Sequence, residues 1–414
     1  MTASAPRTTA RPQLAVDGAG RLLQLVRSAS ATTVSELAAA VGASRSTVRQ
    51  RLDLLVEHGL VVLDGPRSSA RGRPAAHASL APGGAVVLVG QVGLSGSRLA
   101  VVDLAGEVLA HALVDGDAAD GADAAVADVV AGLEGLLRTL GRGLSEVAGI
   151  GLGLPSPVEL EDYADAPAGT DLSWGPTHQR LLREHFDAPV HLDRDVNLLA
   201  LAEERRSWPD AEVLVCVKLG TLVDAAVVVR DVPLRGASGR AGHLGGVRGL
   251  AAEAGGAALV RRLAAEGLPV ADVADVVDLA RRGSGPASRA VRGAGAAVGR
   301  ALAPSVALLD PQVVVVWGYL AEAEEHLLPG LREGLREALD DARSTDAPGC
   351  EVVTARLGAL AGVRGAARLV LEHVLAPDVV DRFLVTGSWL AAAPVVAPPG
   401  RGEGLEAPAR QEDR

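Results

Sequence analysis

The chain has 414 residues, enough for two or three domains. Hydrophobic residues make up 48% of it and aromatic residues only 2%, so its core must be built from Val, Leu and Ala. The net charge of −11 excludes a chain that is basic throughout, and apolar runs such as Ala85–Val89 and Val313–Trp317 are too short to cross a bilayer.

The first elements predicted are an arm and two helices. Residues 1–18 are expected to form a disordered arm, because Met1–Pro12 is polar, contains two prolines and has no apolar signal core. A first helix is predicted around Leu22–Val26. The capping box Thr33–Glu36 opens a second helix, which Gly42 closes.

Residues 44–58 predict a DNA recognition helix. Ser44 is suited to cap its start, and one face is expected to be buried because its apolar residues recur at helical spacing: Val48, Leu52, Leu55 and Val56. The opposite face, near the helix start, carries the polar side chains that a helix-turn-helix presents to base edges and phosphates: Arg45, Ser46, Thr47, Arg49 and Gln50.

Two short strands, Leu60–Leu63 and Ala76–Leu80, are predicted next, around a turn rich in Gly, Pro and Arg. They complete a winged helix-turn-helix over residues 19–82, whose wing carries Arg67, Arg71 and Arg73. Up to Pro82 there are ten arginines against five acidic residues, a net charge of +5 that leaves −16 for the rest. The charge pattern therefore localises any contact with nucleic acid to this head.

Pro82–Gly84 is expected to be a hinge, after which the pattern changes to alternating strands and helices. Two comparable series of strands, crossover helix and strand predict a duplicated two-lobed α/β body. The first series consists of Val86–Val92, Arg98–Asp103, Glu107–Leu113, Ala124–Leu140 and Val147–Leu152, and the second begins with Val213–Leu219 and Asp224–Arg230. Residues from about 391 onward are rich in Pro, Gly and Glu and are expected to be a loose tail.

Four segments, taken in order, resemble motifs of the ROK family (repressors, open reading frames and kinases), and specifically its NagC/XylR-like repressors. They are Gly72–Pro74 at the end of the wing turn, Gly149–Val158, Asp193–Glu203 and Arg235–His243. The resemblance covers residues 19–376. It implies an actin-like, ribonuclease-H-like fold with two lobes and a sugar cleft over residues 85–376, a C-terminal extension over residues 377–414, and a homodimer or homotetramer.

The resemblance also shows where kinase chemistry is altered. Asp195 matches the base that accepts the sugar hydroxyl proton in the family's kinases. The preceding family Asn is Arg194 here, and the Glu of the later loop is Arg240. Arginine offers only donors to a sugar, so both positions have changed toward a cation. Asp195 is therefore predicted to be inactive and held by a neighbouring arginine.

The phosphate and zinc sites of the family are altered as well. Gln91 replaces the Asp that organises Mg²⁺, and Asp224 replaces a glycine of the second phosphate loop, where it would repel phosphate. His243 matches a zinc ligand, but no cysteine lies between Cys216 and Cys350 to complete the site. We therefore expect no ATP, no metal and no other cofactor. His243 is either an effector contact or a structural residue of its loop.

These observations favour a transcriptional regulator, acting as a repressor of carbohydrate-related genes, with double-stranded operator DNA as its partner and the cytoplasm as its location. The alternative is an active ATP-dependent sugar kinase with an accessory DNA-binding head; a third interpretation is an interaction protein that binds no DNA. A sugar, including an acidic or phosphorylated one, is the expected effector, bound by Arg194, Asp195, Arg240 and His243. Equally, Arg194 or Arg240 could neutralise Asp195 and fill the pocket.

Overall fold

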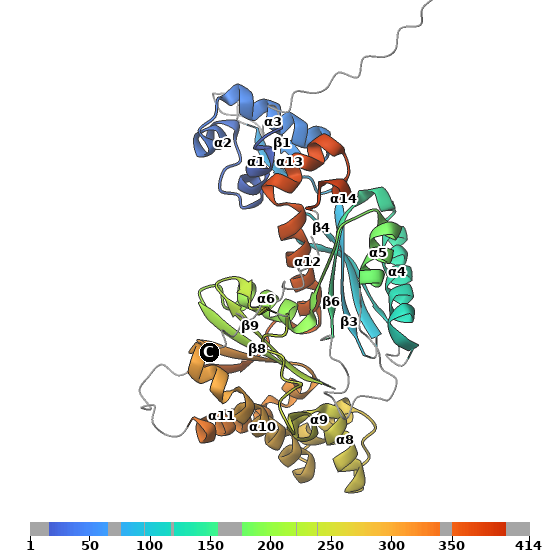
Figure 1. The fold of residues 1–414 in the computed structure, drawn as a ribbon, viewed down its shortest axis with the longest axis vertical. Coiled ribbons are helices and arrows are strands. Elements are labelled where there is room, and N and C mark those ends of the chain that lie inside the picture. Colours follow the sequence, from blue (N-terminus) through green and yellow to red (C-terminus); the bar gives the residue numbers. More distant parts are fainter. Residues whose placement is uncertain are drawn as a thin grey trace, which may run out of the picture.

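The computed structural model describes residues 16–64, 76–94, 96–116, 120–155, 176–220, 222–237, 239–339 and 350–394. They form a small N-terminal head at one end of the long axis, followed by two α/β lobes (Figure 1). The predicted winged helix-turn-helix and the actin-like two-lobed body are both confirmed. Part of the predicted arm, the wing arginines Arg67, Arg71 and Arg73, and most of the predicted tail lie outside the described residues.

The head contains α1 (Ala19–Arg27), α2 (Val34–Val41) and α3 (Arg45–Glu57), followed by the antiparallel strands β1 (Val61–Asp64) and β2 (His77–Leu80). The capping box of Thr33 and Glu36 opens α2, and Gly42 ends it with a φ of 65°. Val48, Leu52 and Leu55 of α3 are fully buried. The prediction for Val56 is wrong, because its side chain is 39% exposed at the edge of the buried stripe.

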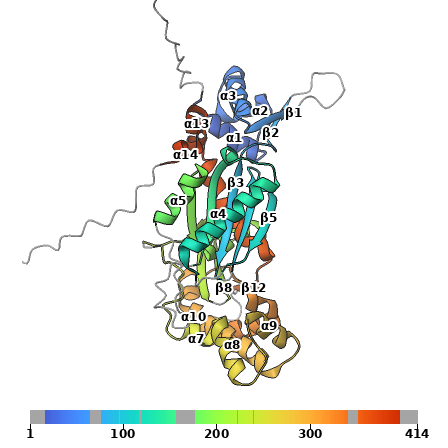
Figure 2. The ribbon, with the colours of Figure 1, turned by 90° about the vertical axis from the view of Figure 1, so that its right-hand side faces the viewer.

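The first lobe is built on a five-stranded sheet of order β5-β4-β3-β6-β7. β3, β4 and β5 are antiparallel neighbours, whereas β6 and β7 run parallel to β3. Their bounds are β3 (Val86–Gly93), β4 (Gly96–Asp103), β5 (Val108–Val114), β6 (Val147–Leu154) and β7 (Val190–Arg194). Helices α4 (Gly121–Thr139) and α5 (Pro176–Phe186) cover the outer face of this sheet (Figure 2). The short helix η3 (Leu144–Glu146) leads into β6.

The second lobe repeats this plan with the sheet order β10-β9-β8-β11-β12. Its strands are β8 (Val213–Leu219), β9 (Val223–Val229), β10 (Val232–Pro233), β11 (Val313–Trp317) and β12 (Glu351–Thr354). The outer face packs against a helical layer: α7 (Leu250–Ala254), α8 (Gly256–Ala265), α9 (Val273–Arg281), α10 (Gly285–Leu309), η5 (Tyr319–Ala323) and α11 (Glu324–Ala338). The repeated plan confirms the predicted duplication.

Two helices pack between the sheets: α6 (Asp195–Ser207) lies against the second sheet, and α12 (Ala361–Val374), which follows η6 (Gly358–Leu360), lies against the first. They cross so closely that a Cβ atom on Gly365 would collide with the carbonyl oxygen of Leu198. In space the layers therefore follow the order first sheet, α12, α6, second sheet (Figure 1).

After α12 the chain returns to the head through α13 (Pro377–Thr386) and α14 (Trp389–Ala392). The Asp381 carboxylate accepts hydrogen bonds from the backbone N–H groups of Gly18 (2.8 Å) and Gly20 (2.7 Å) at the start of α1. Phe383 stacks on Trp389 and meets His58 of the head edge to face. The helix α13 thus packs against the head, and α14 packs against α13.

Candidate functional site

The predicted recognition helix presents a polar face to solvent. Arg45, Ser46, Arg49 and Gln50 are exposed and Thr47 is half-buried. The Ser44 hydroxyl caps the helix by accepting a hydrogen bond from the backbone N–H of Thr47 (3.1 Å). Because the opposite face is packed into the head core, these side chains point away from the protein near the helix N-terminus, where a helix-turn-helix contacts DNA.

Arg49 already forms an ion pair on this face. Its Nε lies 3.0 Å from Oδ1 of Asp53, one turn along α3, and both side chains are more than half exposed. An exposed pair of this kind contributes only about 0.3–0.5 kcal/mol. Arg49 can therefore exchange Asp53 for a phosphate or a base edge at little cost.

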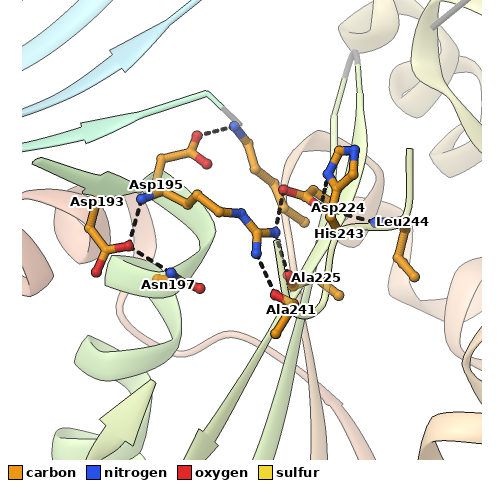
Figure 3. A network of polar contacts seen from close by, with 10 residues as sticks. Asp193, Asp195, Asn197, Asp224, Ala225, Ala241, His243 and Leu244 are labelled. Carbon is orange, nitrogen blue, oxygen red and sulfur yellow. Dashed lines mark hydrogen bonds and ion pairs between the residues drawn. The ribbon is translucent and has the colours of Figure 1, made fainter. Parts of the chain in front are cut away.

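A network of charged residues surrounds the point where β7 ends and α6 begins (Figure 3). Arg194, the last residue of β7, extends its guanidinium into the second lobe. It donates to Asp224 Oδ2 (2.6 Å) and to the carbonyl oxygens of Ala225 (2.7 Å) and Ala241 (2.6 Å). The Arg194 and Asp224 side chains are only 5% and 7% exposed, so this ion pair is buried.

Asp195, which matches the family's catalytic base, is also ion-paired, but its partner is Lys218 and not the neighbouring arginine that was predicted. Its Oδ2 accepts a hydrogen bond from the ammonium group of Lys218 on β8, and Asp195 itself is almost fully buried. A general base must be free to take a proton from a substrate hydroxyl. A carboxylate that is ion-paired inside the protein is a poor candidate for that work.

Asp193 completes a run of three charged residues. Its Oδ2 accepts from Arg235 Nη2 (2.6 Å) and Nε (3.1 Å), and its Oδ1 accepts from the side-chain amide of Asn197 (2.7 Å). Arg235 belongs to the loop after β10 in the second lobe. Asp193, Arg194 and Asp195 therefore each contact an opposite charge carried by the second lobe.

The two remaining predicted effector residues lie on the loop that follows Arg235. His243 Nδ1 lies 3.3 Å from Asp224 Oδ1, and both side chains are buried. Arg240 is exposed, and its carbonyl oxygen accepts a hydrogen bond from the His243 backbone N–H (3.0 Å). The structure thus gathers Arg194, Asp195 and His243 at one place and leaves Arg240 on the outer side of the same loop.

The predicted set omitted Lys218, Asp193 and Arg235, and it placed Asp224 only in a phosphate loop. One signal was available: Lys218 is the single lysine in a chain that otherwise uses arginine, and it follows a buried run of β8. The pairing of Arg194 with Asp224 joins residues 30 positions apart, which sequence spacing alone does not reveal.

A second charged cluster lies where α6, α12 and the β9–β10 turn meet. Arg368 of α12 contacts Glu204 (3.0 Å), Asp231 (3.0 Å) and Glu372 (2.9 Å). Burial raises the pKa of Glu204, although the hydrogen bond from Arg368 opposes that shift. Arg368 therefore ties the helix packed on the first sheet to both α6 and the second lobe.

The geometry can be compared with known proteins. The ROK family model matches residues 91–373, more than half of the chain. The chain belongs to the ROK family. A separate model, described as a helix-turn-helix domain, matches residues 19–64. This ROK protein therefore carries a helix-turn-helix domain ahead of its two lobes, and no helix in its described residues is long and apolar enough to cross a membrane.

Its relatives include both regulators and kinases. A putative xylose repressor from a Caldicellulosiruptor species is 24% identical over 53% of this chain, which spans about half (54%) of that repressor's length. A glucokinase from Halalkalibacterium halodurans is 26% identical over 68% of this chain and 94% of its own length. Sequence similarity alone does not separate the two activities.

Among solved structures, a ROK family transcriptional regulator described as a homolog of the E. coli MLC protein has a TM-score of 0.70. It is 20% identical, and the match covers 90% of this chain and 99% of that one. A ROK family glucokinase from Streptomyces griseus, in complex with glucose and AMPPNP, has a TM-score of 0.57 at 23% identity and covers 69% of this chain and 98% of its own. At these identities the likeness establishes the fold.

Proposed function

We propose that this ROK protein is a DNA-binding transcriptional regulator that represses carbohydrate-related genes. The observation that carries the proposal is the exposed polar face of α3 on a capped, well-packed helix-turn-helix. The putative xylose repressor among its relatives supports the carbohydrate link. The body would act as an oligomeric platform that places two heads on two half-sites of an operator.

In this mechanism the start of α3 enters the major groove. Arg45, Ser46, Arg49 and Gln50 contact base edges and phosphates there, and the wing arginines contact the backbone or the minor groove. The net charge of +5 up to Pro82, against −16 for the remainder, directs the head rather than the body to DNA.

The test begins with genome-wide mapping of bound DNA, followed by binding measurements on the operator that it identifies. We expect Arg45→Ala and Arg49→Ala each to weaken binding by about 1–3 kcal/mol. Each should also reduce the slope of log K against log salt concentration by about 1, the contribution of one phosphate contact. Arg282→Ala is the matched control, because Arg282 forms an exposed pair with Asp278 one turn away, as Arg49 does with Asp53, but lies in the second lobe. Unchanged affinity in both head variants contradicts the proposal.

Sugar phosphorylation is the second candidate, favoured by the Asp at position 195 and by the kinases among the relatives. Against it stand the Lys218–Asp195 ion pair, Gln91 and Asp224. ATP turnover with a panel of hexoses decides between them. Robust turnover that Asp195→Asn abolishes would replace the regulator as the primary function.

The cleft is also the proposed place of effector control. A sugar bound beside Arg194, Asp195, Arg240 and His243 would change lobe closure and therefore the spacing of the heads. A thermal-shift screen with neutral, acidic and phosphorylated sugars tests this part separately. The absence of a shift with every sugar would remove sensing from the proposal and leave DNA binding intact.

A further inference from the structure

We infer that Asp193, Arg194 and Asp195 form a latch that holds the two lobes closed without any bound ligand. Each of the three contacts an opposite charge that the second lobe carries, namely Arg235, Asp224 and Lys218 in that order. These six residues are called the interlobe latch below. The inference goes beyond DNA binding and does not depend on it.

The central pair of the latch is the most deeply buried of the three, with both side chains less than a tenth exposed. The Arg194 guanidinium donates to Asp224 Oδ2 and to the carbonyl oxygens of Ala225 and Ala241, and these three acceptors belong to the second lobe. Separating the lobes would therefore strip a buried cation of these partners and leave the Asp224 carboxylate in a largely apolar strand. A buried charge that loses its partner is far more costly than an exposed one.

The other two pairs, Lys218–Asp195 and Arg235–Asp193, hold the lobes in the same closed arrangement. Lys218 approaches Asp195 from β8, and Arg235 approaches Asp193 from the loop after β10, so the contacts come from three separate segments of the second lobe. Asp224 is held in turn by the backbone N–H of Leu244 (3.2 Å) and by His243. The second lobe thus supplies partners to Asp193 and Arg194 at the end of β7 and to Asp195 at the start of α6, and Figure 3 shows the contacts of Arg194 and Asp195.

The latch has a consequence for regulation. Where a ligand bridges two lobes, binding closes them. Here the protein's own charges already bridge them, so an anion that reaches Arg194 competes directly with Asp224. A ligand of this cleft would therefore open the lobes rather than close them.

The test measures the distance between the lobes in the full-length protein without DNA or sugar. Spin labels are placed at Leu113→Cys on the first lobe and Leu308→Cys on the second, whose side chains are 62% and 83% exposed. Cys350→Ser removes the partly exposed native thiol, and Cys216 is fully buried. Pulsed electron resonance then gives the distribution of distances between the labels.

The decisive variant is the double substitution Arg194→Met and Asp224→Asn, which removes both charges together and so leaves no unpaired buried ion. We expect one narrow distance population in the labelled parent and a broader distribution shifted by several ångströms in the double variant. The control is Arg292→Met with Glu333→Gln, a more exposed ion pair of 2.8 Å between α10 and α11 inside the second lobe, which should leave the distribution unchanged.

The single variants complete a double-mutant cycle. Arg194→Met and Asp224→Asn are each expected to lower the thermal midpoint more than the double variant does, because each leaves one charge unpaired. A double variant whose distance distribution matches both the parent and the control would overturn the latch. Because DNA is absent from the measurement, this failure is distinguishable from a failure of the proposed regulator.

Discussion

At the scale of single residues, His191 on β7 and His373 on α12 face each other with ring centroids 4.2 Å apart. Burial, with a smaller effect of His373, lowers the pKa of His191 to about 3 from its ordinary value of 6.5. Between these two values the folded protein keeps His191 neutral, while the unfolded chain protonates it. The unfolded state then binds the extra proton, so the free energy of unfolding falls as the pH falls from about 6.5 toward 3.

His191→Asn should therefore flatten the pH dependence of stability. Lowering the pH from 7 to 5 reduces the free energy of unfolding of both proteins. In the His191→Asn variant this reduction should be smaller than in the wild type by up to about 2 kcal/mol. Urea unfolding at the two pH values measures the difference. His111→Asn, at an exposed position of β5, is the control and should keep the wild-type dependence. An unchanged pH dependence in His191→Asn would mean that His191 does not carry this linkage.

At the scale of elements, periodicity predicted the individual pieces well. The strand prediction Val213–Leu219 agrees with β8, and the helix prediction Ala124–Leu140 overlaps α4 (Gly121–Thr139), because runs of buried Val and Leu carry a strong signal. Val56 was misplaced because at 3.6 residues per turn it lies about 80° around α3 from Val48. That angle puts it at the rim of the buried stripe.

How the elements pack was less visible in the sequence. The crossing of α6 and α12 depends on Gly365, where the carbonyl oxygen of Leu198 occupies the place of a side chain. A glycine in a helical pattern is ordinarily a weakness, since it costs about 1 kcal/mol relative to alanine. Only the structure distinguishes a glycine that a neighbouring helix requires from one that faces open space.

Alanine substitutions should separate these two kinds of glycine. Gly365→Ala forces α6 and α12 apart and should lower the free energy of unfolding by about 1–3 kcal/mol or more. Gly293→Ala in α10 is the matched control: its Cβ would meet nothing within 4 Å, so it should raise the free energy by about 0.5–1 kcal/mol. Chemical denaturation of both variants tests the pair, and equal effects of the same sign would contradict the close crossing.

At the scale of the whole molecule, the relations that matter join residues far apart in sequence. The family motifs predicted Arg194 and Asp195 as effector-binding residues, but not that the second lobe supplies a partner for each of Asp193, Arg194 and Asp195. Likewise, α13 lies in a segment predicted only as a C-terminal extension, yet its Asp381 reaches Gly18, 363 residues earlier. Local pattern carries no signal for either arrangement.

Asp381 supplies the cap that α1 lacks, since Gly18 at its N-cap has no side chain to accept the first backbone N–H groups. Losing a helix cap costs about 1 kcal/mol or more. Asp381→Ala should therefore speed hydrogen exchange of the α1 amides by roughly tenfold, and Asp381→Asn, which keeps one acceptor oxygen, by less. The control is Asp378→Ala, which breaks only the exposed pair with Arg382 on the same helix. Equal exchange of α1 in the Asp381→Ala and Asp378→Ala proteins would show that Asp381 does not cap α1. Faster exchange confined to the Asp381 variants would show that α13 stabilises the start of α1 and so joins the body to the head.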